Sequence, residues 1–483
     1  MPEGLPITPI RNFLNGVIRP AEVGAILKPE GAVDECINGH FDSKGRVSRR
    51  YGYTRLGTAA VSSGYPILGL HNFRDAPTGT NHRLLAVAAD GTNSDVYYLN
   101  SSNVWTKTLQ DDTKDLKTRF ATFLDRIIRV NGTDAAKSWD GDTANAWLTT
   151  GGPLDIADAP IGSFVEVYKS RLYIATASTL YFTPVPTSSM TIAWNISDDY
   201  TLINPNDGDD ITALKRFALE LCVFKRDYTY RWRGIAGTDP DPLIGVGTHS
   251  QESVVSSKAG ISFHHPTGLY LYRGSTPGEI SRPISDFVDN VSSSEYANVS
   301  SWQDGDHIYW SVGDVTIAGV TVTNVIFRYT ISSQVWTVYS TAHRIRVGAQ
   351  YISGTTATQV VGDATGSVHT FNSGNSDNGT AISYRLMTKY YELGAIASAS
   401  FTVNHLTTLC EKAQGMTLSY RVDDDPRWKP IGQLQSYVTH FKSDKVNATG
   451  HRIQFLLSGI SSAEPWIFEG IEILRGIREG VVE

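Results

Sequence analysis

The sequence predicts an all-β protein: a β-propeller with an N-terminal extended arm and a C-terminal β-sandwich-like domain. Short strand-like stretches end in tight-turn signals such as Asp90-Gly91 and Asn131-Gly132. The chain has 23 Tyr and 10 Trp but only 4 Met, and large aromatic residues favour strands. Strand-turn-strand units recur about every 40 residues, which is the period of four-stranded propeller blades.

Residues 1–65 are predicted to form the extended arm. Closely spaced prolines disfavour a helix there: Pro2, Pro6, Pro9, Pro20 and Pro29. Residues 28–39 have room for one helical turn at most, and residues 41–53 are typical of two short strands joined by a turn at 43–45. Such an arm would tie neighbouring subunits together by adding strands to exposed sheet edges.

A small basic cluster lies in this arm, formed by Arg46, Arg49 and Arg50. One interpretation is a solvated strand face, and the other is contact with an acidic neighbour or with DNA phosphate.

Residues 66–376 are assigned to the propeller. Its clearest unit is the hairpin at 219–234, in which Leu219, Leu221 and Val223 alternate with polar or small residues, as on a half-buried strand. After a polar turn at 225–227, one face carries three aromatic residues: Tyr228, Tyr230 and Trp232. We interpret the recurring aromatic residues as core between blades, because a single blade cannot cover both of its faces.

The tryptophans near the ends of successive units are Trp105, Trp147, Trp194 and Trp232. Further units at 268–274, 307–338 and 345–368 bring the count to about seven blades, with six and eight left open.

Residues 377–483 lack the blade period and are assigned to the sandwich-like domain. Longer strands are predicted at 382–389, 400–409, 416–422, 453–457 and 466–474. The acidic hairpin at 419–428 loosely resembles the Asp-box turn of sialidase-like propellers, but Pro426 and Arg427 stand where Gly and Thr are expected. We interpret it as a fold element only.

No nucleotide-binding, hydrolase or metalloprotease motif is present. The one adjacent histidine pair, His264-His265, lies before Pro266, and neighbouring residues of a strand face opposite ways. The acidic run 204–210 is either a calcium loop or a solvated loop, and its glycine is out of register with an EF-hand. We therefore predict no catalytic, cofactor-binding or metal-ligating residue, and no enzyme activity.

The formal net charge of −7 argues against tight non-specific wrapping of nucleic acid, although it allows DNA to pass without sticking. Three widely spaced cysteines, Cys36, Cys222 and Cys410, indicate reduced thiols rather than a disulfide framework. We expect neither a signal peptide nor a membrane span, because no apolar run is long enough.

Several stretches resemble the nozzle or packaged-DNA-stabilising propeller proteins of short-tailed bacteriophages. The N-terminal match consists of Asn15-Gly16, Pro29-Glu30-Gly31-Ala32, Asn38, Asp42, Gly45, Arg50 and Gly52. Residues 171–175, 221–234 and 268–284 are similar to propeller strands and turns of that group.

This resemblance implies a structural virion protein of the phage tail, assembled in the host cytoplasm. It implies a homo-oligomeric ring, commonly a hexamer, below the portal and adaptor proteins, whose channel retains and conducts DNA without sequence-specific binding. Two other functions stay open: a glycan-binding or glycan-cleaving propeller, which needs carboxylates at the channel mouth, and a peptide-binding scaffold, which usually shows clear repeat signatures that this chain lacks.

Overall fold

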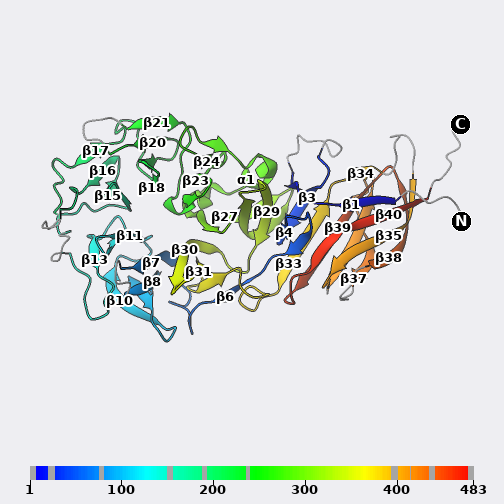
Figure 1. The fold of residues 1–483 in the computed structure, drawn as a ribbon, viewed down its shortest axis with the longest axis horizontal. Coiled ribbons are helices and arrows are strands. Elements are labelled where there is room, and N and C mark those ends of the chain that lie inside the picture. The colour runs from blue at the N-terminus through cyan, green and yellow to red at the C-terminus, as the bar shows by residue number, and fades with distance from the viewer. Residues whose placement is uncertain are drawn as a thin grey trace.

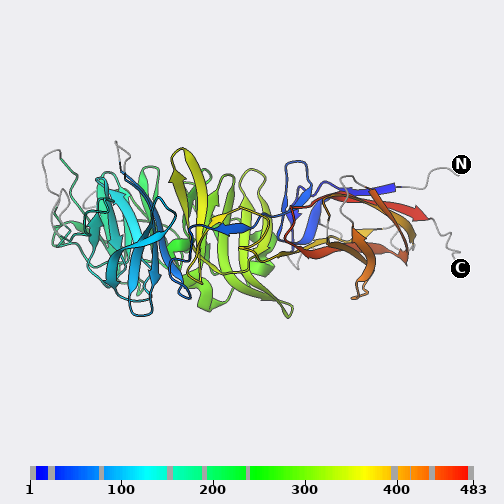
Figure 2. The same ribbon diagram turned by 90° about the horizontal axis from the view of Figure 1, so that it is seen from below.

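A computed structural model of the chain describes residues 7–19, 28–75, 81–149, 156–187, 193–234, 240–392, 401–413, 415–434 and 441–476. These residues form a propeller and a two-sheet unit that lie end to end, and the first and last described strands, β1 and β40, both belong to the two-sheet unit (Figure 1). Seen from below, the molecule is elongated and flat (Figure 2). Within the described ranges, no helix is long and apolar enough to cross a membrane.

The propeller consists of seven antiparallel sheets, so the prediction of an all-β propeller is confirmed. The first four blades are β7 (Ile67–Arg74), β8 (His82–Ala89), β9 (Ser94–Leu99) and β10 (Trp105–Asp112); β11 (Arg119–Phe123), β12 (Arg126–Val130) and β13 (Lys137–Trp139); β14 (Phe164–Tyr168), β15 (Arg171–Thr176), β16 (Thr179–Phe182) and β17 (Tyr200–Leu202); and β18 (Ala213–Phe217), β19 (Glu220–Phe224), β20 (Thr229–Trp232) and β21 (Asp241–Ile244).

The remaining blades are β22 (Val255–Ser257), β23 (Gly260–His265), β24 (Gly268–Tyr272) and β25 (Gly278–Glu279); β26 (Ser300–Asp304), β27 (His307–Ile317), β28 (Val320–Thr330) and β29 (Val335–Ser340); and β30 (Ile345–Ser353), β31 (Thr356–Asp363), β32 (Val368–Phe371) and β6 (Tyr53–Arg55). The short helix α1 (Ser285–Val288) and three 3-10 turns, Gln251–Ser253, Arg282–Ile284 and Ser293–Asn298, lie between blades.

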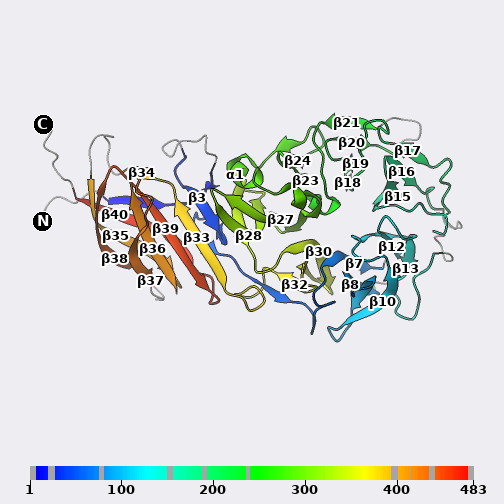
Figure 3. The same ribbon diagram turned by 180° about the vertical axis from the view of Figure 1, so that it is seen from behind.

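The ring is closed by strands from opposite ends of the propeller segment. The innermost strands β7, β11, β14, β18, β22, β26 and β30 each contact the next one, and β30 contacts β7. The outer strand of the seventh blade is β6, which pairs with β32 in the register Phe371↔Tyr53. Residues from the predicted arm therefore complete the last blade (Figure 3).

Buried aromatic residues fill the spaces between blades, as the sequence predicts. Trp139 and Trp147 of the second blade stack on each other at 5.5 Å and pack in one cluster with Phe73 of the first blade. Trp232 lies in the cluster shared by the third and fourth blades. Burying such side chains on both faces of each sheet stabilises the ring, at roughly 25 cal/mol per Å² of apolar surface removed from water.

The hairpin at 219–234 forms β19 and β20, with Leu221 opposite Trp232. The prediction that β19 is half-buried is wrong, because Cys222 is as buried as Leu221 and Val223. Neighbouring blades cover both faces of this central strand. Leu219, predicted to belong to the buried face, is 81% exposed because it lies in the turn before the strand.

Two layers of strands form the sandwich-like unit, and one of them continues the sheet of the sixth blade. One contains β1 (Ile7–Arg11), β4 (Gly39–Phe41), β5 (Val47–Arg49), β35 (Phe401–Glu411), β38 (Phe441–Gly450) and β40 (Ile467–Gly476). The other contains β2 (Gly16–Val17), β3 (Ala32–Ile37), β33 (Ile382–Thr388), β34 (Tyr391–Glu392), β36 (Met416–Val422), β37 (Lys429–Leu434) and β39 (Arg452–Ser461).

The described part of the predicted arm is not a free extension. Its strands pair within the chain: β1 with β40, β3 with β33, β5 with β40 and β6 with β32. Residues 28–39 contain strand β3 in place of the helical turn that the sequence allowed. Residues 1–6 and 20–27 of the arm, with Pro2, Pro6 and Pro20, lie outside the described residues.

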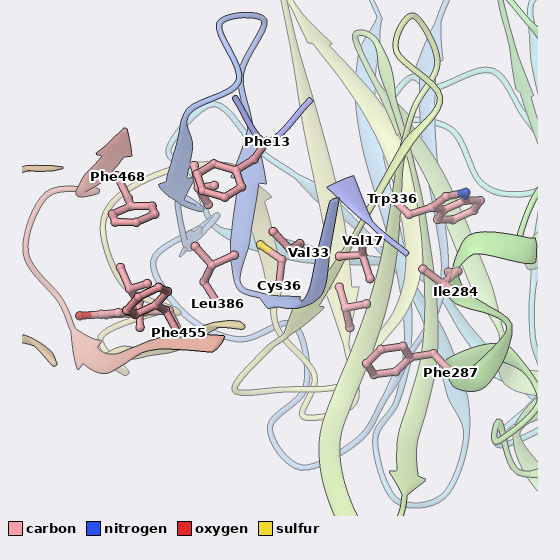
Figure 4. Packing of buried hydrophobic residues seen from close by; sticks show 14 of the residues in the cluster. Phe13, Val17, Val33, Cys36, Ile284, Phe287, Trp336, Leu386, Phe455 and Phe468 are labelled. Atoms are coloured by element: carbon pink, nitrogen blue, oxygen red, sulfur yellow. The ribbon is translucent and has the colours of Figure 1, made fainter. Parts of the chain in front are cut away.

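Strand β3 joins the propeller to the sandwich-like unit. It lies between β29 of the sixth blade and β33, so one sheet runs from the blade into the sandwich. The largest hydrophobic cluster follows this connection (Figure 4). It contains Trp336 and Phe287 on the propeller side and Leu386, Phe455 and Phe468 on the sandwich side. The two units therefore share one core.

Candidate functional site

An ion pair crosses the central channel of the propeller. Arg119 begins β11 of the second blade, and Glu252 precedes β22 of the fifth blade, so the two side chains come from non-adjacent blades. Nε of Arg119 donates to Glu252 at 2.8 Å, and Nη2 donates at 3.2 Å. Lys117 Nζ and Ser250 Oγ also donate to this carboxylate, each at 3.0 Å.

These donors define what Glu252 can do chemically. Arg119 and Lys117 hold the pKa of the buried Glu252 carboxyl well below its usual range, although burial alone would raise it. A carboxylate that stays ionised is a poor proton donor, and its oxygens are already occupied by four hydrogen bonds. Glu252 therefore links the inner strands of separate blades. It does not support the alternative function of a glycosidase, which needs a carboxylic acid that can donate a proton.

The space around this ion pair is a cavity of about 490 Å³. Its walls include the other channel carboxylate, Glu166, and two cations of β18, Lys215 and Arg216. His71 also lines it, and burial lowers the pKa of this imidazole to about 4. A side chain of Gln251 closes the edge of β18 by bonding both backbone groups of Leu214.

The histidine pair, which precedes Pro266 in the sequence, ends strand β23. His264 lies against Tyr296, with ring centroids 5.6 Å apart, whereas His265 bonds Thr267 at 2.7 Å. The two rings therefore make different direct contacts. Among the residues that the structure describes, no group of three or more His, Cys, Asp or Glu is arranged to hold a metal ion.

The acidic run 204–210 surrounds an ammonium group. Lys225 is fully buried and donates to Asp207 Oδ1 at 2.5 Å, to the Asp209 carbonyl at 2.7 Å and to the Asn204 carbonyl at 3.0 Å. The oxygens that suggested a calcium loop are thus coordinated by a side-chain cation. Lys225 belongs to the turn at 225–227, whose polar sequence gives no sign that this side chain is buried.

A buried polar node lies where the arm, the seventh blade and the sandwich meet. Arg50 is 1% exposed and donates to Asp377 at 2.8 and 2.7 Å. It also donates to the Asn38 side chain and to the carbonyls of Tyr51 and Ser340. These contacts use all five donors of the guanidinium.

The basic cluster of the arm is therefore not a solvated face, and that interpretation is wrong. Arg49 is fully buried and donates to the carbonyls of Asn375 and Ala463. Arg46 donates to Asp42 at 2.7 Å. The acidic neighbours belong to the chain itself: Asp42 lies four positions before Arg46, and Asp377 lies 327 positions after Arg50. Buried in this way, Arg49 and Arg50 do not reach DNA phosphate.

Other residues of the N-terminal match also shape this junction. Gly52 packs so closely that an added Cβ would lie 1.9 Å from the Ser376 carbonyl oxygen. Gly45 closes the turn before β5 at a φ of +75°, where glycine is favoured. The side chain of Asn38 bonds Arg50, the Ser340 N–H and the Ser383 carbonyl.

A second cavity, about 740 Å³, lies beside this junction. Its walls come from the tip of the β27–β28 hairpin, from β3 and from the outer face of β33, β36 and β39. Arg385 and Arg19 contact Glu35 at 3.0 and 3.4 Å, and burial raises the pKa of Glu35. Arg421 lies over the Trp428 ring at 4.8 Å at the sandwich end, where the hairpin at 419–428 connects β36 and β37.

Fold and site together define a seven-bladed β-propeller that is fused to a two-sheet unit and whose channel is crossed by an ion pair. No protein-family model and no curated protein sequence matches the chain. Solved structures that resemble it include BamB from Moraxella catarrhalis, with 11% identity, a TM-score of 0.41, and coverage of 75% of this chain and 97% of that one.

The Pan2 WD40 domain from Neurospora crassa has 10% identity and a TM-score of 0.43, and the match covers 68% of this chain and 96% of that one. The AfRom2 CNH domain has 11% identity and a TM-score of 0.39, with 66% and 99% covered. At these identities the likeness concerns the fold alone.

Proposed function

We propose that this chain is a structural subunit of the tail of a tailed bacteriophage. Copies form a ring below the portal and adaptor, and the channel between them retains and conducts the packaged DNA. The observation that carries the proposal is the junction around Arg50 and Gly52. The N-terminal residues that resemble phage nozzle proteins are those that fasten the propeller to the sandwich-like unit.

The geometry supports a particular path for DNA. The propeller's own channel is crossed by Arg119 and Glu252 and leaves a cavity of about 490 Å³. That space is too small for a duplex, whose major groove alone is about 12 Å wide. DNA would therefore pass along the axis of a ring of several copies, each contributing an outer surface. A chain of net charge −7 would repel DNA weakly and let it slide.

The alternative of a glycan-active propeller has less support. The tryptophans that could stack on sugars, such as Trp139 and Trp232, are buried between blades. The channel carboxylate Glu252 is held ionised by two cations. Neither feature presents the sugar platform or the proton donor that such an activity needs.

Light scattering at several protein concentrations, alone and with the purified portal and adaptor proteins, tests the proposal. We expect a discrete ring of about six copies, either alone or on the adaptor. A monomer that binds neither protein at any concentration would overturn it. Glycan arrays on the same sample check the alternative, and saturable binding to a defined glycan would favour that function.

A further inference from the structure

The propeller channel carries positive charge that no described side chain neutralises. Two cavities share Leu68 and Glu252 in their walls: the channel cavity of about 490 Å³ and an adjoining one of about 220 Å³. Their walls hold five cationic side chains and three carboxylates. The net charge of these walls is therefore positive, whereas the net charge of the whole chain is −7.

The pairing of these charges shows where the excess lies. Glu252 is shared by two cations, Lys117 and Arg119. Among the described residues, Lys215, Arg216 and Arg346 have no carboxylate within ion-pair distance. Nε of Arg346 is buried and has no hydrogen-bond partner there. Burial, together with the nearby charges of Arg119 and Arg346, lowers the pKa of Lys117 despite its contact with Glu252.

We propose that these two adjoining cavities bind a small multivalent oxyanion, namely a phosphate or polyphosphate group, with Lys215 and Arg216 of β18 in the wall of the larger cavity and Arg346 in the wall of the smaller one. Cations lining a recess with low-dielectric walls concentrate anions there. Lys and Arg donors form charge-assisted hydrogen bonds to phosphate oxygens.

This inference is independent of the tail proposal, because it concerns the channel inside one propeller and not the channel between copies. The site is of the size that proteins use for small ligands, several hundred Å³. Glu166 is the carboxylate that opposes binding: it lines the cavity and contacts only the N–H of Val167 among described hydrogen bonds.

Isothermal titration of the full-length protein with inorganic phosphate, pyrophosphate and ATP, at constant ionic strength, tests the proposal. We expect saturable binding of pyrophosphate at one site per chain, with a dissociation constant on the order of 1 mM or tighter. If ATP binds at least as tightly as pyrophosphate, the ligand is a phosphate group carried by a nucleotide. If ATP binds more weakly than pyrophosphate, the ligand is the free anion. No saturable binding of any of the three probes would overturn the proposal.

Three variants locate the site. Lys215→Gln and Arg346→Gln should each weaken pyrophosphate binding about tenfold, because each removes a charge-assisted contact. Glu166→Gln should strengthen it about threefold by removing a like charge. Lys44→Gln, the same charge change on an exposed turn of the sandwich-like unit, should leave it unchanged. Circular dichroism checks that each variant folds. Equal effects of Lys44→Gln and Lys215→Gln, or weaker binding by a folded Glu166→Gln, would contradict the site.

Discussion

Arg50 donates two hydrogen bonds to the carboxylate of Asp377, and both side chains are at most 4% exposed. The pair joins the segment that precedes the propeller to the segment that follows it. It therefore closes the junction at the point where the chain enters and leaves the ring of blades.

Breaking this pair should destabilise the protein strongly. Asp377→Ala leaves a buried guanidinium without its counter-charge, and we expect a loss of about 3–5 kcal/mol in the free energy of unfolding. Arg50→Lys should also destabilise the protein, although it keeps the positive charge, because an ammonium group cannot make the five hydrogen bonds of the guanidinium. Guanidinium denaturation measures both. Glu464→Gln, which removes a pair with Lys412 on the surface, serves as the control and should change little. A wild-type midpoint for Asp377→Ala would show that the node contributes nothing.

Gly52→Ala should destabilise the same junction for a steric reason. The new methyl group would meet the Ser376 carbonyl at 1.9 Å, so the backbone must move, at a cost of about 1–3 kcal/mol. Gly278→Ala is the matched control, since nothing lies within 4 Å of its added Cβ. Thermal unfolding of the two variants should separate them by several degrees. Equal melting temperatures would mean that the close packing at Gly52 is not present in solution.

Stability should fall as the solution is acidified below about pH 6.5. Burial lowers the pKa of His264 to about 3, and His265 and His249 add to the effect. The unfolded chain takes up a proton near pH 6.5, while the folded chain resists it, so acid favours unfolding. The stability present above pH 6.5 is lost progressively as the pH falls toward 3.

His264→Phe should flatten this dependence. The substitution removes one group that is protonated only on unfolding. The free energy of unfolding should therefore fall by about 2 kcal/mol less between pH 6.5 and pH 5 than in the wild type. Urea midpoints measured across this range should fall less steeply for the variant than for the wild type. His451→Phe changes an exposed histidine and should follow the wild type. Parallel curves for His264→Phe and wild type would contradict the buried neutral imidazole.

The cysteines should differ in reactivity. Cys36 and Cys222 are buried, and burial raises the pKa of Cys36 to about 12 and raises that of Cys222 as well. Cys410 is partly exposed. A thiol reagent at pH 8 should therefore label Cys410 first in the native protein and all three thiols after denaturation. Rapid native labelling of Cys222 would show that the fourth and fifth blades do not pack as described.

The propeller could be predicted from sequence because its signals are local. The hairpin that contains Leu221 and Trp232 shows its alternation and its turn within sixteen residues. Inter-blade packing follows from the same pattern, since a four-stranded blade with two apolar faces needs a neighbour on each side.

The junction and the channel could not be predicted in this way. Tyr53 pairs with Phe371, and Arg50 pairs with Asp377, across more than 300 residues, and no local pattern reveals such partners. Strands β37 and β38 were missed because they are polar strands at sheet edges. Lys225 looks like a turn residue in the sequence, and only the folded loop shows that three oxygens surround it.

We propose that copies of this chain assemble into a ring around a channel for DNA. Electron microscopy of the purified protein, alone and mixed with its adaptor, tests this most directly. We expect closed rings of about six elongated subunits around a central opening wide enough for a duplex. Isolated elongated particles under every condition, or rings whose centre is filled by the propellers, would contradict it.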